Sequence, residues 1–276
     1  MPELPEVQTV VSTLRPRVTG SRIATVRLHR TDIVNPAGVD LPPLLRGRTI
    51  TAVERRAKRI VFTLDDRDLF YVHLGMTGQL TVEHADAPVR PHTHLVMALE
   101  KRGSRSEKRE GLELRFRDPR RFGGVFWLGS QSPDDGLGPE PLSLRPGRLA
   151  NALARTRRAI KAALLDQALI AGIGNIYADE ALFLARIHPL TAANTLSPEQ
   201  VGRLNRAIKL TLRRAIRARG STLRDFVDAD NAPGGYRSRH QVYDRAGETC
   251  RRCRTVIERI VLTGRSTCFC PRCQPA

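Results

Sequence analysis

The sequence predicts an α+β fold: an N-terminal helix with a β-sandwich, then a helical region, then a C-terminal β-hairpin. Three observations predict it. Apolar residues recur at helical spacing directly after Pro5, and short strand-like runs separated by turn residues follow. Beyond a segment rich in Ser, Pro, Gly and Asp the pattern becomes helical again, and all five cysteines lie between Cys250 and Cys273.

The first element is an amphipathic helix that starts near Pro5. Glu3 and Glu6 lie at the N-terminal end of this helix, where carboxylates interact favourably with the positive end of the helix dipole. Pro16 and Gly20 predict the end of the helix. Its apolar face comprises Val7, Val10, Val11, Leu14 and Val18.

Short strands at regular spacing predict the sandwich, although the same pattern also fits a barrel. The charged run from Lys101 to Glu110 predicts a mobile loop. The expected strands are Ile23–Leu28, Thr49–Val53, Ile60–Leu64, Leu69–Leu74, His94–Leu99, Leu112–Phe116 and Gly124–Leu128.

The second half of the chain is predicted to be mainly helical. Ser197 and Gln200 form a capping box for a long basic helix that ends at Gly220. The shorter expected helices are Leu149–Ala154, Ile160–Gln167 and Ile176–Ala185. The resulting domain prediction is a β-sandwich over 1–130, a linker over 131–147, a helical domain over 148–240 and a cysteine-bearing segment over 241–276.

The charge balance predicts a polyanionic partner. The chain carries 46 Lys and Arg against 28 Asp and Glu, a formal net charge of +18. Nucleic acid is the first expectation and an anionic membrane surface the second. No apolar run is long enough to span a bilayer, and the N-terminus lacks the basic and apolar regions of a signal peptide.

The cysteine spacing predicts one structural zinc ion. Cys250-x2-Cys253 and Cys270-x2-Cys273 are separated by 16 residues, within the range of four-cysteine zinc sites. Two disulfides are the alternative, and they fit poorly with a chain that lacks a secretion signal. Cys268 is left over, and strand alternation directs it to the other face from the ligands.

The opening Met1-Pro2-Glu3 offers a candidate nucleophile. Removal of Met1 would expose Pro2 as a secondary amine that can attack an electrophilic sugar carbon and form an imine. The alternative is that Pro2 and Pro5 only open the helix, which by itself is the commoner role of such prolines.

Several other motifs are open to two interpretations. In Asp118–Gly123 the turn carries Arg120 and Phe122, which suit a wedge into a base stack, but Phe122 could instead pack in the core. The same alternatives hold for Met76 in the Gly-rich loop that follows His73.

Backbone-binding candidates are equally ambiguous in isolation. Gly172–Asn175 precedes a helix and could bind phosphate through backbone amides, with Lys161 shortly upstream. His92-x-His94 could suggest metal, but a strand-edge role or a phosphate contact is favoured. Arg265 lies in the turn of the cysteine-bearing hairpin, facing either phosphate or solvent.

Taken together, these motifs resemble the bacterial formamidopyrimidine-DNA glycosylases over the whole chain. The motifs that carry the resemblance are the opening Pro-Glu-Leu-Pro-Glu, Arg55–Lys58, His73–Met76, Asp118–Gly123, Gly172–Tyr177 and the four-cysteine finger. The resemblance implies a catalytic β-sandwich domain, a helix–two-turns–helix DNA-binding domain and a zinc finger. It implies base excision repair of double-stranded DNA by a monomer in the bacterial cytoplasm, associated with the nucleoid.

The implied activity is removal of oxidised purines such as 8-oxoguanine and formamidopyrimidines, followed by cleavage of the strand. Pro2 resembles the Schiff-base nucleophile and Glu3 the assisting acid, while Lys58 and Arg265 resemble groups that serve β- and δ-elimination. The residues that match DNA-contacting positions are His73, Met76, His92, Arg120, Phe122, Lys161 and Asn175. We expect a mobile loop over Thr222–Tyr236 to cap the extruded base.

Two other functions remain open from the sequence. An endonuclease VIII-type glycosylase would act on oxidised pyrimidines, although Leu4 and the Arg-Arg-Phe turn resemble the purine branch. A non-catalytic zinc-finger DNA-binding protein would explain the charge and the cysteines. It would leave Pro2, Glu3 and Lys58 without a role.

Overall fold

The computed structural model describes residues 2–101 and 111–276. These residues form two compact units, one of residues 1–135 with 219–235 and one of 136–218 with 236–276. The segment 219–235, which we assigned to the helical domain, therefore packs with the N-terminal unit. Met1 and most of the predicted loop over Lys101–Glu110 lie outside the described residues. The removal of Met1 and the mobility of that loop therefore stay predictions.

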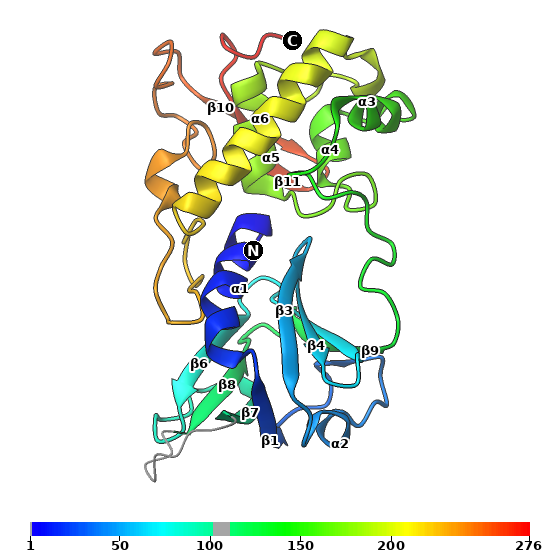
Figure 1. The fold of residues 1–276 in the computed structure, drawn as a ribbon. Coiled ribbons are helices and arrows are strands. Elements are labelled where there is room, and N and C mark those ends of the chain that lie inside the picture. Colours follow the sequence, from blue (N-terminus) through cyan, green and yellow to red (C-terminus); the bar gives the residue numbers. More distant parts are fainter. Residues whose placement is uncertain (1, 102–110) are drawn as a thin grey trace. The chain divides into compact units, whose positions relative to one another are not determined.

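The first unit begins with α1 (Leu4–Val18), as the apolar spacing predicts (Figure 1). Pro5 lies in its first turn, where the missing N–H is not needed. Pro16 does not end the helix, which continues to Val18 and closes when the Thr19 N–H donates to the Arg15 carbonyl.

Two sheets form the sandwich. One has the order β1-β7-β8-β6 and is antiparallel throughout, with β1 (Ser21–Leu28), β7 (Thr93–Lys101), β8 (Leu112–Arg117) and β6 (Gln79–His84). The other has the order β2-β9-β5-β4-β3, with β2 (Val34–Asn35), β9 (Gly124–Gly129), β5 (Leu69–His73), β4 (Arg59–Leu64) and β3 (Ile50–Arg56). Only the β2–β9 pair is parallel.

The sequence prediction omitted β6, β2 and the short helix α2 (Leu41–Leu45). In β6 only Leu80 and Val82 alternate with polar residues, and β2 is too short to show a period. Two prolines follow the first residue of α2, where the start of a helix tolerates them.

The core of the first unit is shared by helix and sheets. Val7 and Leu14 of α1 belong to the same buried cluster as Phe62 of β4 and Phe70 of β5, whose rings stack at a centroid distance of 4.5 Å. Phe226 joins this cluster from the segment 219–235. That segment is thus anchored by apolar burial as well as by hydrogen bonds.

The second unit contains four α-helices and the hairpin within the described residues: α3 (Pro146–Ala154), α4 (Ile160–Leu165), α5 (Asn175–Ala185), α6 (Pro198–Arg217), β10 (Glu258–Leu262) and β11 (Arg265–Phe269). Helix α5 is buried along most of its length and packs against α6 and β11 (Figure 1). The capping box of Ser197 and Gln200 is present at the start of α6. Among the described helices, none has the length and apolarity required to cross a membrane.

Replacing Phe62 with Ala tests the shared core. The side chain is fully buried, so we expect a loss of about 3–5 kcal/mol in the free energy of unfolding of the first unit. Urea denaturation followed by circular dichroism measures it. Val89→Ala, at a side chain 48% exposed in the same unit, is the control and should change stability little. A loss below about 1 kcal/mol for Phe62→Ala would contradict the role of this stack.

Candidate active site and metal centre

A pair of buried carboxylates organises the N-terminus. The Glu3 N–H donates to Glu6 Oε2 at 2.8 Å, and Glu6 Oε1 accepts the N–H of Ser221 at 2.7 Å. Glu3 and Glu6 are 2% and 1% exposed, and Pro2 is buried in the extended segment just before α1. Glu3, the residue next to Pro2, is therefore held in place through its backbone N–H. The Glu6 carboxylate also connects the start of α1 to the segment 219–235.

Lys58 and His73 lie close together at the ends of neighbouring strands. Lys58 lies in the β3–β4 turn and is largely buried, and His73 pairs with Arg59 in the β4–β5 ladder. Burial, assisted by the positive charges of Lys58 and Arg59, lowers the pKa of His73 to about 4. The ring is therefore neutral near pH 7, and its Nδ1 accepts the Gly75 N–H at 3.1 Å.

Asp118 holds the two predicted wedge loops together. Its Oδ1 accepts the Thr77 hydroxyl at 2.6 Å and its Oδ2 accepts the Gly123 N–H at 2.8 Å. Gly75 adopts a φ of +59°, and a Cβ there would lie 2.3 Å from the Gly123 nitrogen. Only glycine permits this approach.

The side chains that these loops carry point into solvent. Phe122 is 58% and Met76 42% exposed, which excludes the core-packing alternative for both. The Arg120 guanidinium lies over the Phe122 ring at 4.9 Å. His92 is also exposed, with a φ of +66°, whereas His94 is buried and its Nε2 bonds to the Asp118 carbonyl at 2.9 Å. His92 therefore faces solvent and His94 faces the interior, so the two histidines do not form a metal site.

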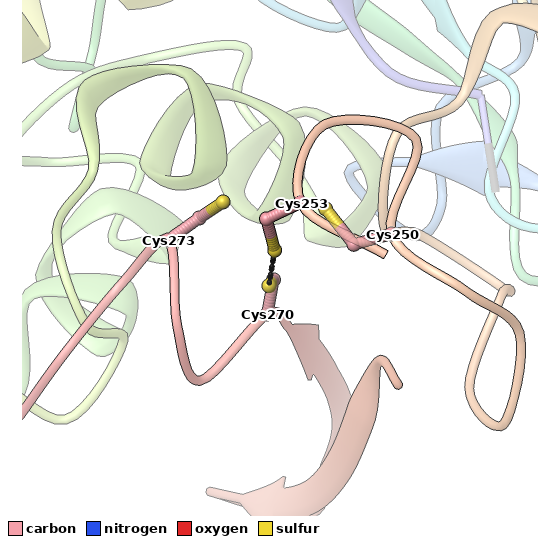
Figure 2. Close-up of side chains that lie close together, drawn as sticks. All are labelled: Cys250, Cys253, Cys270 and Cys273. Carbon is pink, nitrogen blue, oxygen red and sulfur yellow. Dashed lines mark hydrogen bonds between the residues drawn. The ribbon is translucent and has the colours of Figure 1, made fainter. Parts of the chain in front are cut away.

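The four cysteines at the predicted spacing come together in the second unit (Figure 2). Their sulfur atoms all lie within 4.8 Å of one another, and those of Cys253 and Cys270 are 3.4 Å apart. A tetrahedral zinc site with Zn–S bonds of 2.3 Å places its sulfurs about 3.8 Å apart, so the cluster fits this ion. The cysteines form no disulfides, which excludes the alternative pairing.

Cys268 is not part of the cluster. It lies buried in β11, and its backbone N–H donates to Asp179 Oδ2 at 3.0 Å. The expectation that Cys268 is not a ligand is confirmed, but the alternation argument for it is wrong, because residues two apart in a strand share a face. Cys270 instead lies beyond the end of β11 at Phe269.

The predicted contact of Lys161 with DNA is wrong, because its side chain is fully buried. Its Nζ lies 2.6 Å from Asp179 Oδ1 and donates to the Ser266 carbonyl at 2.9 Å and to the Thr267 hydroxyl at 2.8 Å. Desolvation raises the pKa of the Asp179 carboxyl, and the Lys161 ammonium opposes this shift. Lys161 therefore supports the hairpin from within.

Arg265 projects from the part of β11 that Lys161 supports. Thr263 and Gly264 both have positive φ in the turn, and Arg265 pairs with Leu262 as the first residue of β11. Asn175 Nδ2 also donates to the Ser266 carbonyl, at 2.9 Å. Arg265 itself is exposed, and in the described part of the chain its guanidinium has no carboxylate partner.

Sequence reasoning missed Glu6, Asp118 and Asp179 as organising residues. The i, i+3 spacing of Glu3 and Glu6 is that of a capping box and could have indicated Glu6. Asp118 precedes a proline in a turn, which is a common position for a side chain that accepts backbone N–H groups. No local signal connects Asp179 with Lys161 or Cys268.

Replacing Lys161 with Met leaves the Asp179 carboxylate buried without its ammonium partner. We expect a loss of about 3–5 kcal/mol in the free energy of unfolding of the second unit. The double variant Lys161→Met/Asp179→Leu should recover most of it, because no uncompensated charge remains. Lys209→Met, on α6, is the matched control. Equal stability of Lys161→Met and the control would contradict the buried pair.

Cys250→Ser removes one zinc ligand. We expect one zinc ion per chain in the unaltered protein and in Cys268→Ser, and a loss of zinc in Cys250→Ser, all measured by elemental analysis. Affinity for duplex DNA should fall with the zinc, because the hairpin that carries Arg265 is released. Full zinc loss with unchanged affinity would refute that link.

Family models match nearly the whole chain. Residues 1–125 match the formamidopyrimidine-DNA glycosylase N-terminal domain, residues 137–227 its H2TH domain, and residues 247–276 the zinc finger found in FPG and IleRS. The zinc-finger match agrees with the geometry of the four cysteines, which form the site of one structural zinc ion.

Curated relatives and solved structures agree. The formamidopyrimidine-DNA glycosylase of Chloroflexus aurantiacus is 44% identical over 99% of this chain and 98% of its own, and that of Symbiobacterium thermophilum 45% over 100% and 90%. The Lactococcus lactis Fpg bound to abasic-site DNA has a TM-score of 0.89 at 33% identity, covering 99% of this chain and 100% of its own. The same enzyme bound to DNA with an oxidised pyrimidine also scores 0.89 at 33% identity, with full coverage of both chains. The chain belongs to the formamidopyrimidine-DNA glycosylase family.

Proposed function

We propose that this protein is a bifunctional DNA glycosylase and lyase of base excision repair that removes oxidised purines from double-stranded DNA. The observation that carries the proposal is the N-terminus. Pro2 directly precedes the buried Glu3, whose backbone is held by Glu6 at the positive end of α1. Family membership supplies the substrate class, and the arrangement at Pro2 is consistent with its chemistry.

The reaction begins once Met1 has been removed. The Pro2 nitrogen, then a secondary amine, attacks the anomeric carbon of the damaged nucleotide, and the bond from that carbon to the base breaks. Glu3 supplies a proton that assists opening of the sugar ring. The leaving base takes up a proton, and an iminium ion joins Pro2 to the sugar.

Strand cleavage follows from the iminium ion. Its positive charge acidifies the neighbouring C2′–H, so loss of that proton expels the 3′ phosphate, and a second elimination expels the 5′ phosphate. Lys58 and Arg265 are the proposed participants in these two steps. Hydrolysis of the iminium ion then returns the free amine of Pro2.

Reaction at the sugar requires the damaged nucleotide to leave the duplex. Flipping it out costs stacking and pairing, and side chains that enter the gap offset that cost. Met76, Arg120 and Phe122 are suited to this role, since they are exposed on loops that Asp118 and Gly75 hold in contact. Arg120 would face the orphaned cytosine.

The remaining proposed contacts are to the DNA backbone. His73, His92 and Asn175 are the candidates, and Thr222–Tyr236 stays our prediction for the segment that caps the extruded base. Lys161 is now assigned to positioning Ser266 and hence Arg265, not to DNA. We further propose that the protein acts as a monomer, in the bacterial cytoplasm and associated with the nucleoid.

Borohydride trapping on a duplex containing 8-oxoguanine tests the nucleophile. Reduction of the iminium ion should leave a covalent protein–DNA adduct. We expect adduct formation to fall by at least about a thousandfold in Pro2→Gly. The matched control keeps every side chain but extends the chain before Pro2, which turns its nitrogen into an amide, and it should form no adduct. An adduct of undiminished yield in that control would refute the role of the Pro2 nitrogen.

The same assay separates the two alternative functions. Tight binding without any adduct from the unaltered protein would support a non-catalytic binding module. Faster cleavage of a thymine glycol duplex than of an 8-oxoguanine duplex would place the enzyme in the endonuclease VIII-type branch. The comparison matters, because the Lactococcus lactis Fpg has been seen bound to DNA with an oxidised pyrimidine.

A further inference from the structure

The second unit contains a pocket of about 400 Å³ that the proposed chemistry does not use. Arg214 and Arg217 line it from the C-terminal part of α6, and Arg239 lines it from the short 3₁₀ helix η2 (Tyr236–Arg239). Tyr236 and Thr211 are largely buried and contribute to its wall. Positive side chains from two separate elements therefore share one cavity.

The three arginines are not neutralised by protein groups. Within the residues that the structure describes, none of their guanidinium groups forms an ion pair or a hydrogen bond to the protein, and all three residues are exposed. Cations near the end of a helix complement its dipole, which accounts for Arg214 and Arg217 without any ligand. It does not account for Arg239, which comes from another element and lines the same pocket.

Hydroxyl groups add neutral donors to the wall. Burial raises the pKa of Tyr236 to about 12, so the phenol keeps its proton at neutral pH and can donate. Its ring is held by Tyr177 and His240, with centroid distances of 6.0 and 5.7 Å. Among the described residues, neither the Tyr236 nor the Thr211 hydroxyl has a hydrogen-bond partner in the protein, so both are available to a ligand.

The one carboxylate in the pocket wall is already engaged. Glu180 accepts the backbone N–H groups of Gln241, Val242 and Tyr243, each at 2.9 Å. These hydrogen bonds fix the segment that follows Arg239, while burial raises the pKa of the Glu180 carboxyl. With three guanidinium groups and at most one carboxylate charge, the wall keeps an excess of at least two positive charges.

We infer that this pocket binds a phosphate group. A carboxylate ligand would use one guanidinium fork, whereas three guanidinium groups and two hydroxyls match the several oxygens of a tetrahedral oxyanion. Two sources share this chemistry: the backbone of duplex DNA, and a free phosphate or phosphate ester. The inference does not depend on the Pro2 nucleophile.

Two double variants of equal charge test the pocket. Arg214→Gln/Arg239→Gln removes one guanidinium from each contributing element. Arg213→Gln/Arg237→Gln removes one from each of the same elements, at exposed side chains that do not line the pocket. Tyr236→Phe removes only a hydroxyl, and it keeps the test valid if the pocket double variant does not fold.

Inorganic phosphate is titrated at constant ionic strength, and the arginine Nε–H and the backbone N–H signals of Tyr236–Gln241 are followed by NMR. We expect saturable shifts that the control variant keeps. Binding should weaken at least about tenfold in the pocket variant and roughly threefold to tenfold in Tyr236→Phe.

Binding of an undamaged duplex at several salt concentrations identifies the source. If a DNA phosphate occupies the pocket, the salt slope of the pocket variant should fall by about one unit relative to the control. A slope equal to the control, with phosphate titration lost, identifies a free phosphate ester. If the two double variants agree in both titration and slope, the inference is overturned.

Discussion

Buried carboxylates that accept backbone N–H groups are the constraint on which the functional segments depend. A buried N–H group that has no hydrogen-bond partner costs about 1–3 kcal/mol. The Glu6 carboxylate accepts the backbone N–H groups of Glu3 and Ser221, and Asp118 accepts that of Gly123. Asp179 accepts the N–H of Cys268, and Glu180 accepts those of residues 241–243. A carboxylate can accept hydrogen bonds from two or three donors, and each of these bonds is stronger than the bond that a neutral acceptor would form.

This use of carboxylates also shapes the charge of the surface. The acidic residues that work as internal acceptors are not available to pair with surface arginines. Arg214, Arg239 and Arg265 accordingly carry no carboxylate partner among the described residues. The chain has 46 basic and 28 acidic residues, a net charge of +18, so its surface carries guanidinium groups that no carboxylate neutralises. Such a surface suits a polyanionic partner.

The sequence predicted the parts that depend on local pattern. Helical spacing found α1 and α6, and cysteine spacing found the metal centre, because period and ligand spacing are written in neighbouring residues. It failed for Lys161, whose position before a Gly-rich turn contains no information about burial. The burial depends on Asp179 and Thr267, which come from α5 and β11. For Met76 and Phe122 the sequence left open whether the side chains pack in the core, and their exposure in the structure excludes that alternative.

Glu6 gives the first unit a cooperative element that neither α1 nor the segment 219–235 would form alone. Its two oxygens bond to Glu3, the neighbour of Pro2, and to Ser221, the neighbour of the predicted capping segment. Gly220 adopts a φ of +76°, in the left-handed region, and a Cβ there would lie 2.8 Å from Glu6 Oε1. Displacing this segment therefore removes one of the donors that hold the Glu6 carboxylate, and with it part of the order at Glu3. The position of the proposed nucleophile and the position of the proposed base-capping segment are then set by the same buried group.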